Sequence, residues 1–377
     1  MAYVVKKPKS SSASASEGDR YAESISQWQT LYERIYSQTP THPDQTFNII
    51  GWNSSYTDKP IPKEEMRQWV EHTVERILPL QPKRVLEIGC GNGLLLSRIA
   101  PRCTQYWGTD FSQQALLHIE QLTKSQPGLE QVTLMERMAD NFEGIEADAF
   151  DTVILNSVLQ YFPSIDYLLR VLEGAVNAVR TGGCIFVGDV RSLPLLEAYH
   201  TSIALYQASQ ELEPSLLLSR VRSRLAQEEE LVINPAFFTA LKQHLPQIGH
   251  VQVLPKQGRH HNELTKFRYD VILHIGSQVP TTKDIKWLDW QPKWTLASIR
   301  QLLQATEPKI LGWRSVPNAR LEAEIKTLKW LTTQPRECPC CQGVSAGEYS
   351  PAEPPPVGQH GGRQLPAEGD PPSAHSE

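Results

Sequence analysis

The sequence predicts an α/β protein whose core is a doubly wound, mostly parallel sheet with helices on both faces. Two observations predict this fold. Short apolar runs alternate with amphipathic helical segments between residues 81 and 276, as expected for buried parallel strands joined by helices. The first apolar run, residues 85–88, leads through a glycine-rich turn into a helical segment. Such glycines allow close approach of a ligand, and free amides at a helix start favour polar groups, so the turn predicts a nucleotide site.

The glycine turn and the next strand indicate which nucleotide binds. The turn reads E-x-G-x-G-x-G from Glu87 through Gly89, Gly91 and Gly93, and the second strand ends at Asp110. An acid about 20 residues beyond the turn can hydrogen-bond the ribose hydroxyls of NAD or of S-adenosylmethionine (SAM). We favour SAM because the turn is not G-x-G-x-x-G, and because the Glu87 carboxylate would attract a cationic ammonium and repel a pyrophosphate.

Five further strands complete the sheet. The third, fourth and fifth are expected over residues 131–135, 150–155 and 184–188, and an antiparallel pair over residues 251–255 and 268–275. Ser112 is expected to cap a helix that ends near residue 125. A helix over residues 163–180 should end at the glycine pair before the fifth strand.

Residues after the strands are expected to line the ligand crevice, because ligands of open parallel sheets bind beyond the carboxyl ends of the strands. The fourth strand is followed by Asn156, Ser157 and Tyr161. Asp140 follows the third strand, and its carboxylate either accepts a hydrogen bond from the adenine amino group or is an exposed turn acid. Phe142 or Met138 would then cover a face of the adenine ring.

The remaining segments differ from the core in composition. We expect a flexible leader over residues 1–20, a helical N-terminal extension over 21–80, a helical insertion over 195–245, a helical connector over 277–334 and a disordered tail over 335–377. The aromatic residues near the start of the extension are expected to pack and not to contact a ligand. The insertion is assigned to substrate selection, and its acidic run, residues 227–230, is expected to form a solvated face. The tryptophans of the connector should pack it onto the core.

Composition excludes several classes of protein. The net charge of -5 argues against general nucleic-acid binding. No apolar run approaches the roughly 20 residues that span a bilayer, and the N-terminus lacks an apolar signal core, so a cytoplasmic enzyme is expected. Cys90, Cys103 and Cys184 should be free thiols. The C-x-C-C cluster at residues 338–341 has no matching second pair, so no metal site is expected.

Four separated blocks give the sequence a family resemblance: GWNSSY at residues 51–56, NSVLQYFP at 156–163, GDVRSLP at 188–194 and HNELTKFRYD at 261–270. With these blocks, the chain resembles the class I SAM-dependent methyltransferases over residues 25–330. More narrowly, it resembles the methyltransferase domains embedded in bacterial (cyanobacterial-type) nonribosomal peptide synthetases. The resemblance implies a seven-stranded, Rossmann-like sheet with an antiparallel last strand, and an N-terminal lid over the SAM pocket.

The resemblance and the strand positions together give the expected cofactor site. Its residues are Trp52, Tyr56, Glu87, Gly89, Gly91, Gly93, Asp110, Phe111, Ala139, Asp140, Asn141, Asn156, Ser157 and Tyr161. The cofactor expected there is SAM.

Polar residues near the fifth strand and the final hairpin are candidates for the acceptor site. They are Asp189, Arg191, His261, Asn262, Glu263 and Tyr269. Glu263 or Asp189 could take a proton, Arg191 could hold a carbonyl or carboxylate, and Asn262 could orient an amide. Alternatively, Asp189 and Arg191 pair with each other, and Glu263 braces the hairpin. His260 and His261 would face opposite ways, with His261 the better site candidate.

The resemblance implies methyl transfer to the amide or amino nitrogen of an aminoacyl or peptidyl intermediate attached to a carrier protein, with synthetase modules as partners. O-methylation of a hydroxyl or enol remains an alternative, since no residue excludes it. A non-catalytic docking module is a second alternative, although the intact glycine turn and Asp110 argue against it. A small-molecule methyltransferase outside assembly lines is a third. No nucleic-acid or membrane partner is expected.

Overall fold

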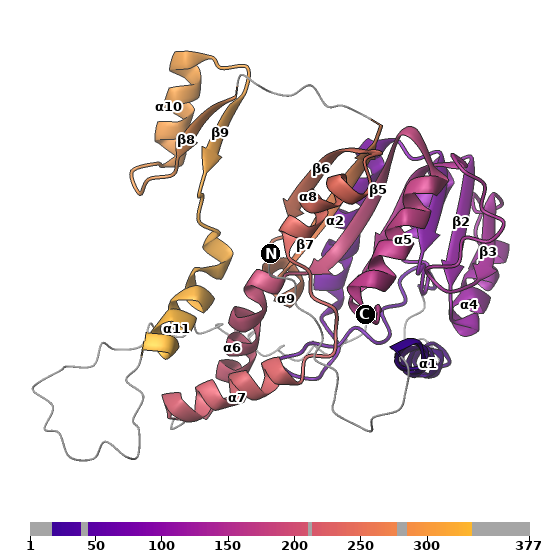
Figure 1. The fold of residues 1–377 in the computed structure, drawn as a ribbon, viewed down its shortest axis with the longest axis horizontal. Coiled ribbons are helices and arrows are strands. Elements are labelled where there is room, and N and C mark those ends of the chain that lie inside the picture. The colour runs from indigo at the N-terminus through magenta and orange to yellow at the C-terminus, as the bar shows by residue number, and fades with distance from the viewer. Residues whose placement is uncertain (1–16, 39–43, 210–212, 277–284, 334–377) are drawn as a thin grey trace, which may run out of the picture.

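The computed structural model describes residues 17–38, 44–209, 213–276 and 285–333 of the chain (Figure 1). The expected disordered tail, the C-x-C-C cluster and most of the expected leader lie outside these residues. The first helix begins at Glu17, inside the segment expected to be a flexible leader. Cys90, Cys103 and Cys184 are free thiols, as expected. Within the described ranges, no helix is long and apolar enough to cross a membrane, and no cluster of side chains is suited to a metal ion.

A seven-stranded sheet forms the centre of the molecule. Its strands are β1 Arg84–Ile88, β2 Gln105–Asp110, β3 Val132–Glu136, β4 Phe150–Asn156, β5 Val179–Arg191, β6 Ile248–Pro255 and β7 Arg268–Ile275. Their order is β3-β2-β1-β4-β5-β7-β6, and β7 is antiparallel to both of its neighbours. The doubly wound, mostly parallel sheet with an antiparallel last strand is thus confirmed. The order reverses between β1 and β4, which places the ligand crevice at their carboxyl ends.

Helices cover both faces and one end of the sheet (Figure 1). They are α1 Glu17–Tyr36, α2 Lys63–Ile77, α3 Leu96–Ile99, α4 Gln113–Ser125, α5 Ile165–Ala178, α6 Leu196–Tyr206, α7 Pro214–Ala226, α8 Pro235–His244, α9 Glu263–Lys266, α10 Leu296–Thr306 and α11 Glu322–Thr333. Short 3-10 turns occur at Leu78–Leu80, Ala100–Arg102, Leu159–Tyr161, Leu193–Leu195 and Ala319–Leu321. Helices α1, α6 and α7 lie at the same end of the sheet (Figure 1).

Two apolar layers hold the helices on the sheet. Side chains alternate between faces along a strand, so Leu86 and Val153 pack with α5 and α8, whereas Val85 and Ile154 pack with α2, α3 and α4. Ser112 caps α4 as expected, accepting a hydrogen bond from the backbone N–H of Ala115 at 3.2 Å.

The boundary between α5 and β5 differs from the expectation. The helix ends at Ala178 and the strand begins at Val179, so Thr181, Gly182 and Gly183 lie within the strand. The reason is pairing, since Val179 already pairs with Phe150 of β4. A glycine pair therefore did not mark the helix end here.

The connector is not only helical. A two-stranded parallel sheet, β8 Lys286–Asp289 with β9 Leu311–Arg314, flanks α10. Trp294 packs edge to face on Trp313 with ring centroids 6.0 Å apart, and Trp287 covers Gly312. These tryptophans therefore pack within the small sheet unit, and the expectation that they hold the connector on the core is wrong for them.

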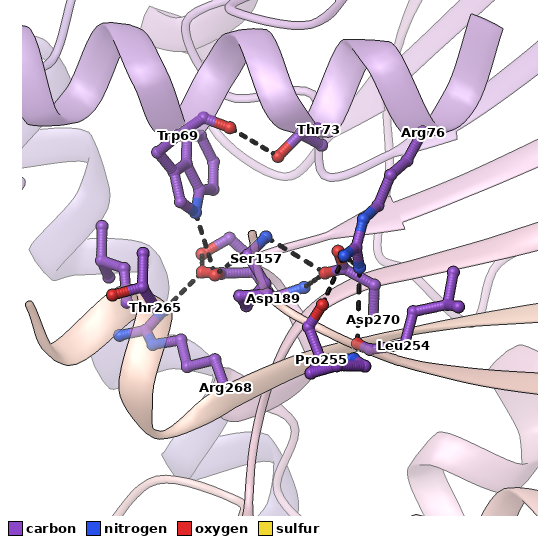
Figure 2. Close-up of polar contacts among 12 residues, drawn as sticks. Trp69, Thr73, Arg76, Ser157, Asp189, Leu254, Pro255, Thr265, Arg268 and Asp270 are labelled. Carbon is purple, nitrogen blue, oxygen red and sulfur yellow. Dashed lines mark hydrogen bonds and ion pairs between the residues drawn. The ribbon is translucent and has the colours of Figure 1, made fainter. Parts of the chain in front are cut away.

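A buried carboxylate, Asp270 of β7, joins the sheet to α2 (Figure 2). The residue is 0% exposed. It accepts hydrogen bonds from Arg76 Nη1 at 2.6 Å, from Lys256 Nζ at 3.1 Å and from the backbone N–H of Asp189 at 2.8 Å. Removing one member of such a buried ion pair destabilises a protein, because the remaining charge stays buried without a partner.

We predict that Asp270→Asn lowers the free energy of unfolding by about 3–5 kcal/mol, because Arg76 then keeps its charge in a buried site without a counter-charge and Lys256 keeps only the more distant Asp189, at 3.6 Å. Urea denaturation measures this value. Glu120→Gln is the control, since the Glu120–Lys124 pair at 3.4 Å is exposed and should contribute less than about 1 kcal/mol. Equal stability losses in the two variants would contradict this assignment.

Candidate active site

Three residues at the carboxyl ends of neighbouring strands adopt a left-handed backbone conformation. Gly89 follows β1 with φ of 75°, Ser157 follows β4 with φ of 56°, and Asp189 in β5 has φ of 62°. Glycine is required at residue 89 because an added Cβ would also lie 2.8 Å from Val158 Cγ2. Non-glycine residues in this conformation are uncommon, and strained backbone clusters at functional sites. The strained turns lie where the strand order places the ligand crevice.

A cavity of about 510 Å³ opens at this end of the sheet. Its sheet side is lined by Gly89, Asp110, Phe111, Ser157 and Tyr161. Its other walls include Trp28, Tyr32, Tyr36, Trp52, Ser55, Arg191, Tyr199, His200, Glu228, Glu230, Glu263 and Arg268. A smaller cavity of about 30 Å³ adjoins the first, shares Gly89, Asp110 and Phe111 with it, and adds Met138 and Ala139. The crevice is therefore long enough to have two chemically distinct ends.

Asp110 lies at the end of β2 with its carboxylate at the cavity. Its oxygens accept hydrogen bonds from the backbone N–H of Gly91 at 2.8 Å and of Ser112 at 2.9 Å. Each carboxylate oxygen has a second lone pair, so ribose hydroxyls can still be bound. Burial raises the pKa of Asp110 to about 6, although these backbone donors favour the ionised form. The residue therefore fits the role expected of it.

Glu87 does not lie at the cavity. It is 3% exposed, and its carboxylate accepts a hydrogen bond from Tyr106 Oη at 2.7 Å. Burial raises the pKa of Glu87 to about 8, against the effect of the Tyr106 hydrogen bond. The side chain is therefore mainly neutral near pH 7 and gives no support to an attraction for a cationic ammonium. Its contact with Tyr106 instead links β1 to β2.

The segment after β3 contributes only part of what was expected. Met138 and Ala139 line the smaller cavity, whereas Asp140 lies 3.4 Å from Arg170 of α5 in a partly exposed ion pair. Asn141 caps its own turn by accepting a hydrogen bond from the backbone N–H of Glu143 at 2.9 Å. The ring of Phe142 packs against Gly174 of α5. Met138 is thus the better placed of the two side chains expected to cover an adenine ring.

The N-terminal extension covers the cavity, and its aromatic residues contribute more than expected. Trp28 and Tyr32 both pack on Tyr161, with ring centroids 4.8 and 5.1 Å apart, and both line the cavity. Their helical spacing indicated only packing, so their place in the cavity wall was missed. Trp52 also lines the cavity, but Tyr56 lies to its side and its hydroxyl contacts Ser202 at 2.8 Å.

Asn156 and Ser157, at the tip of β4, lie in different environments. Asn156 is buried outside the cavity, and its Oδ1 has no hydrogen-bond partner among the described residues. Ser157 lines the cavity and donates a hydrogen bond to Asp189 Oδ2 at 2.9 Å.

Asp189 is not positioned to take a proton from a substrate. The residue is 0% exposed and accepts hydrogen bonds from Trp69 Nε1 at 2.9 Å, from Ser157 and from Arg268, with Lys256 Nζ at 3.6 Å (Figure 2). Burial alone would raise its pKa, but Arg268 and Lys256, together with the hydrogen bonds from Trp69 and Ser157, hold the pKa below its ordinary value. The geometry makes Asp189 an anchor for Arg268 and Ser157.

Arg191 has its charge satisfied by the acidic run of the insertion. It binds Glu228 through Nη1 and Nη2, both at 2.8 Å, and Glu230 through Nη1 at 2.7 Å. It does not pair with Asp189, so that alternative is wrong. The expectation of a solvated acidic face is also wrong for Glu228, whose side chain is 13% exposed. Helix α7 ends at Ala226, and the chain then brings Glu228 back to Arg191.

Of the candidate residues in and near the hairpin, Glu263 lines the cavity, whereas His261, Asn262 and Tyr269 do not. Glu263 lines the cavity and accepts hydrogen bonds from the Ser55 N–H and hydroxyl, both at 2.9 Å, so it also braces the loop of residues 51–56. Asn262 caps α9 and donates to Glu65 at 2.6 Å. His260 and His261 are both exposed. Tyr269 is buried in the apolar layer that packs with α5 and α8, where its hydroxyl donates a hydrogen bond to the Ile233 carbonyl.

Polar side chains at the cavity were also missed from sequence, among them Arg268, His200 and Glu228. Arg268 lines it, and only its Nη1 is bonded within the described part of the chain. His200 of α6 lies 3.0 Å from Glu228. Helical periodicity in the insertion gave no sign of this pair, because the partners are 28 residues apart in a segment without a motif.

Comparisons with known proteins agree with this geometry. Residues 86–185 match the family model of the methyltransferase domain. Chondramide synthase cmdD of Chondromyces crocatus is 48% identical over 323 residues, which cover 83% of this chain and 8% of that protein. CymA, a probable nonribosomal peptide synthetase of Salinispora arenicola, is 38% identical over 301 residues, 80% of this chain and 4% of that protein. The chain thus spans less than a tenth of the length of these two relatives.

Among solved structures, the N-methyltransferase NodS from Bradyrhizobium japonicum in complex with S-adenosyl-L-homocysteine aligns at 16% identity with a TM-score of 0.42. The alignment covers 66% of this chain and 98% of NodS.

The sheet order, the glycine turn and Asp110 agree with the family match and the curated relatives. The chain therefore carries a class I SAM-dependent methyltransferase domain of the kind found in nonribosomal peptide synthetases.

Proposed function

We propose that this domain transfers the methyl group of SAM to the amino or amide nitrogen of an aminoacyl or peptidyl intermediate held on a carrier protein. One observation carries the proposal. A single cavity joins the glycine turn and Asp110 at one end to the charged side chains of the insertion and hairpin at the other. The relatives' synthetase names support synthetase modules as partners.

In this proposal, the cofactor lies at the sheet end of the cavity. The ribose hydroxyls donate to Asp110, the backbone at Gly89 lies against the methionine part, and Met138 and Ala139 contact the adenine. Trp28 and Tyr161 close the space from the side of α1. SAM supplies a methyl group activated by its sulfonium, so the protein has mainly to orient the acceptor and manage its proton.

The acceptor end of the cavity favours an amine. Carboxylates of Glu228, Glu230 and Glu263 line it. Glu228 and Glu230 already bind Arg191, so Glu263 is the carboxylate best placed to attract an ammonium. Arg268 presents N–H groups that have no bonded partner in the described part of the chain and could hold the acyl carbonyl oxygen. The same donors would also stabilise an enolate oxygen, so O-methylation is the second candidate.

A non-catalytic docking module would not need this arrangement. The glycine turn is held by backbone hydrogen bonds, from Gly89 and Cys90 to the Thr109 carbonyl at 2.8 and 3.0 Å. Asp110 is buried and ionisable, with lone pairs to spare. Both features support a working cofactor site.

We predict that Asp110→Ala weakens SAM binding by about 1.5–3 kcal/mol, the range for hydrogen bonds to a charged group. Isothermal titration calorimetry measures the change. Asp166→Ala is the control because that carboxylate is exposed in the first turn of α5. Native affinity in the Asp110 variant would show that the ribose is bound elsewhere.

The affinity for SAM should depend on pH. Asp110 has a pKa of about 6, and the carboxylate form is the acceptor for ribose hydroxyls. Below this pKa binding must first release a proton, so affinity should fall as pH falls, by about tenfold per pH unit. Calorimetry between pH 8 and pH 5 measures the slope. Asp110→Asn should remove it, and an unchanged slope in that variant would assign the titration to another group.

The proposed reaction makes a direct prediction. Incubation with SAM and a panel of aminoacyl N-acetylcysteamine thioesters should add one methyl group to the amine, and tandem mass spectrometry locates the added mass. Asp110→Ala should abolish most of the product at limiting SAM. A methyl group found on oxygen would replace N-methylation by the second candidate. SAM binding without any transfer to carrier-bound or free thioesters would favour the docking module.

A further inference from the structure

Three arginines line the cavity, and they differ in how their charges are balanced. Arg191 is bound by two carboxylates of the acidic run, and Arg268 is bound by Asp189. Arg224, in the last turn of α7, forms no ion pair with any described residue. Its guanidinium is partly exposed and lines the cavity. Arg224 is therefore the arginine of this wall that is best able to bind an anion.

A neutral group holds Arg224 in place. Its Nη2 donates a hydrogen bond to Gln207 Oε1, and Gln207 Nε2 in turn donates to the Tyr56 carbonyl at 3.0 Å. A guanidinium has five N–H donors, so most of those on Arg224 have no partner in the described part of the chain. A positioned guanidinium with free donors suits an anion that has several acceptor oxygens, as a phosphate has.

Arg224 belongs to a stripe of side chains along α7. Leu216, Arg220 and Arg224 are four residues apart, so they lie on the same face of the helix. Leu216 is 49% exposed, and Arg220 is exposed and forms no ion pair with the described residues. Gln227, directly after the helix, lines the cavity as Arg224 does. The stripe therefore joins an exposed apolar and cationic surface to the cavity.

Acidic side chains also lie near Arg224. Arg191 balances one of the two charges of Glu228 and Glu230, and Glu229 lines the cavity as well. The surroundings therefore provide no broad positive field, and an anion would be held by direct contact with the Arg224 guanidinium. Charge-assisted contacts of this kind depend on geometry. They favour an anion that is part of a larger ligand and enters from the α7 side.

We propose that Arg224 binds the phosphodiester of the phosphopantetheine arm on which a carrier protein presents the acceptor, and that Leu216 and Arg220 face the carrier itself. This inference rests on the proposed function. The phosphodiester is the anionic end of such an arm, and the thioester with the acceptor is the other end. The cavity has the matching order, with Arg224 on the α7 side and Gly89 and Asp110 on the sheet side. An arm held at Arg224 therefore directs its thioester toward the cofactor.

The test uses two thioesters of the same amino acid that differ only in the phosphate. One is the pantetheine thioester, and the other carries the phosphate as a methyl diester, which has the single charge of the carrier-bound arm. For native protein, the KM of the diester should be at least about tenfold lower, as expected for a hydrogen bond to a charged group. The kcat values should be equal, because the phosphate contact is the same in the ground state and the transition state.

Arg224→Gln should raise the KM of the diester to that of the pantetheine thioester. It should leave unchanged the KM of the pantetheine thioester, the affinity for S-adenosylhomocysteine and the melting temperature. A purely structural role of Arg224 would not produce this selective loss. Arg222→Gln is the control, because Arg222 is exposed on the opposite side of α7. This variant should keep the native preference for the diester.

Equal KM values for the two thioesters with native protein would overturn the assignment. So would a preference for the diester that persists in Arg224→Gln. The coenzyme A thioester of the same amino acid tests the source of the phosphate, and a KM well below that of the diester would overturn the carrier as the partner. Failure of the proposed function would appear differently, as native protein that binds SAM but methylates none of these thioesters.

Discussion

The site depends on one constraint. The carboxylates of Asp189 and Asp270 are buried, so each must keep its hydrogen-bond and ion-pair partners inside the protein. Trp69 and Arg76 of α2, Lys256 after β6 and Arg268 of β7 all converge on them (Figure 2). Partners of a buried charge cannot leave without a large cost, so the carboxylates fix the positions of three elements at once. The left-handed backbone at Asp189 directs its N–H to Asp270. The interior of the sheet thereby determines where Arg268 and Ser157 meet the cavity.

The two ends of the cavity are built differently. The cofactor end comes from consecutive turns at the carboxyl ends of β1, β2 and β4, and its geometry follows from the sheet. The proposed acceptor end comes from segments far apart in the sequence, including the loop of residues 51–56, α6 and the acidic run. Helix α11 packs on α6 and α7, so the connector supports this end from outside.

The sequence was sufficient for the sheet and for the position of Asp110 at the cavity, because strand spacing and glycine position are local signals. It was not sufficient where a long-range contact decides the role of a side chain. Glu87 reads as an acid near the ligand, but Tyr106 binds it inside the sheet. From the sequence, Arg191 is expected to be free to bind a substrate, but in the fold Glu228 and Glu230 of the insertion bind it. His200 carried no local signal at all, since its significance comes from the cavity and from Glu228.

A crystal structure of the protein with S-adenosylhomocysteine is the most direct test of the proposed site. The account predicts that both ribose hydroxyls lie about 2.6–3.2 Å from the Asp110 carboxylate, with the adenine against Met138 and Ala139. The sulfur should face the part of the cavity that contains Ser157 and His200. A ligand whose ribose contacts Asp140, or one bound away from the glycine turn, would contradict the account.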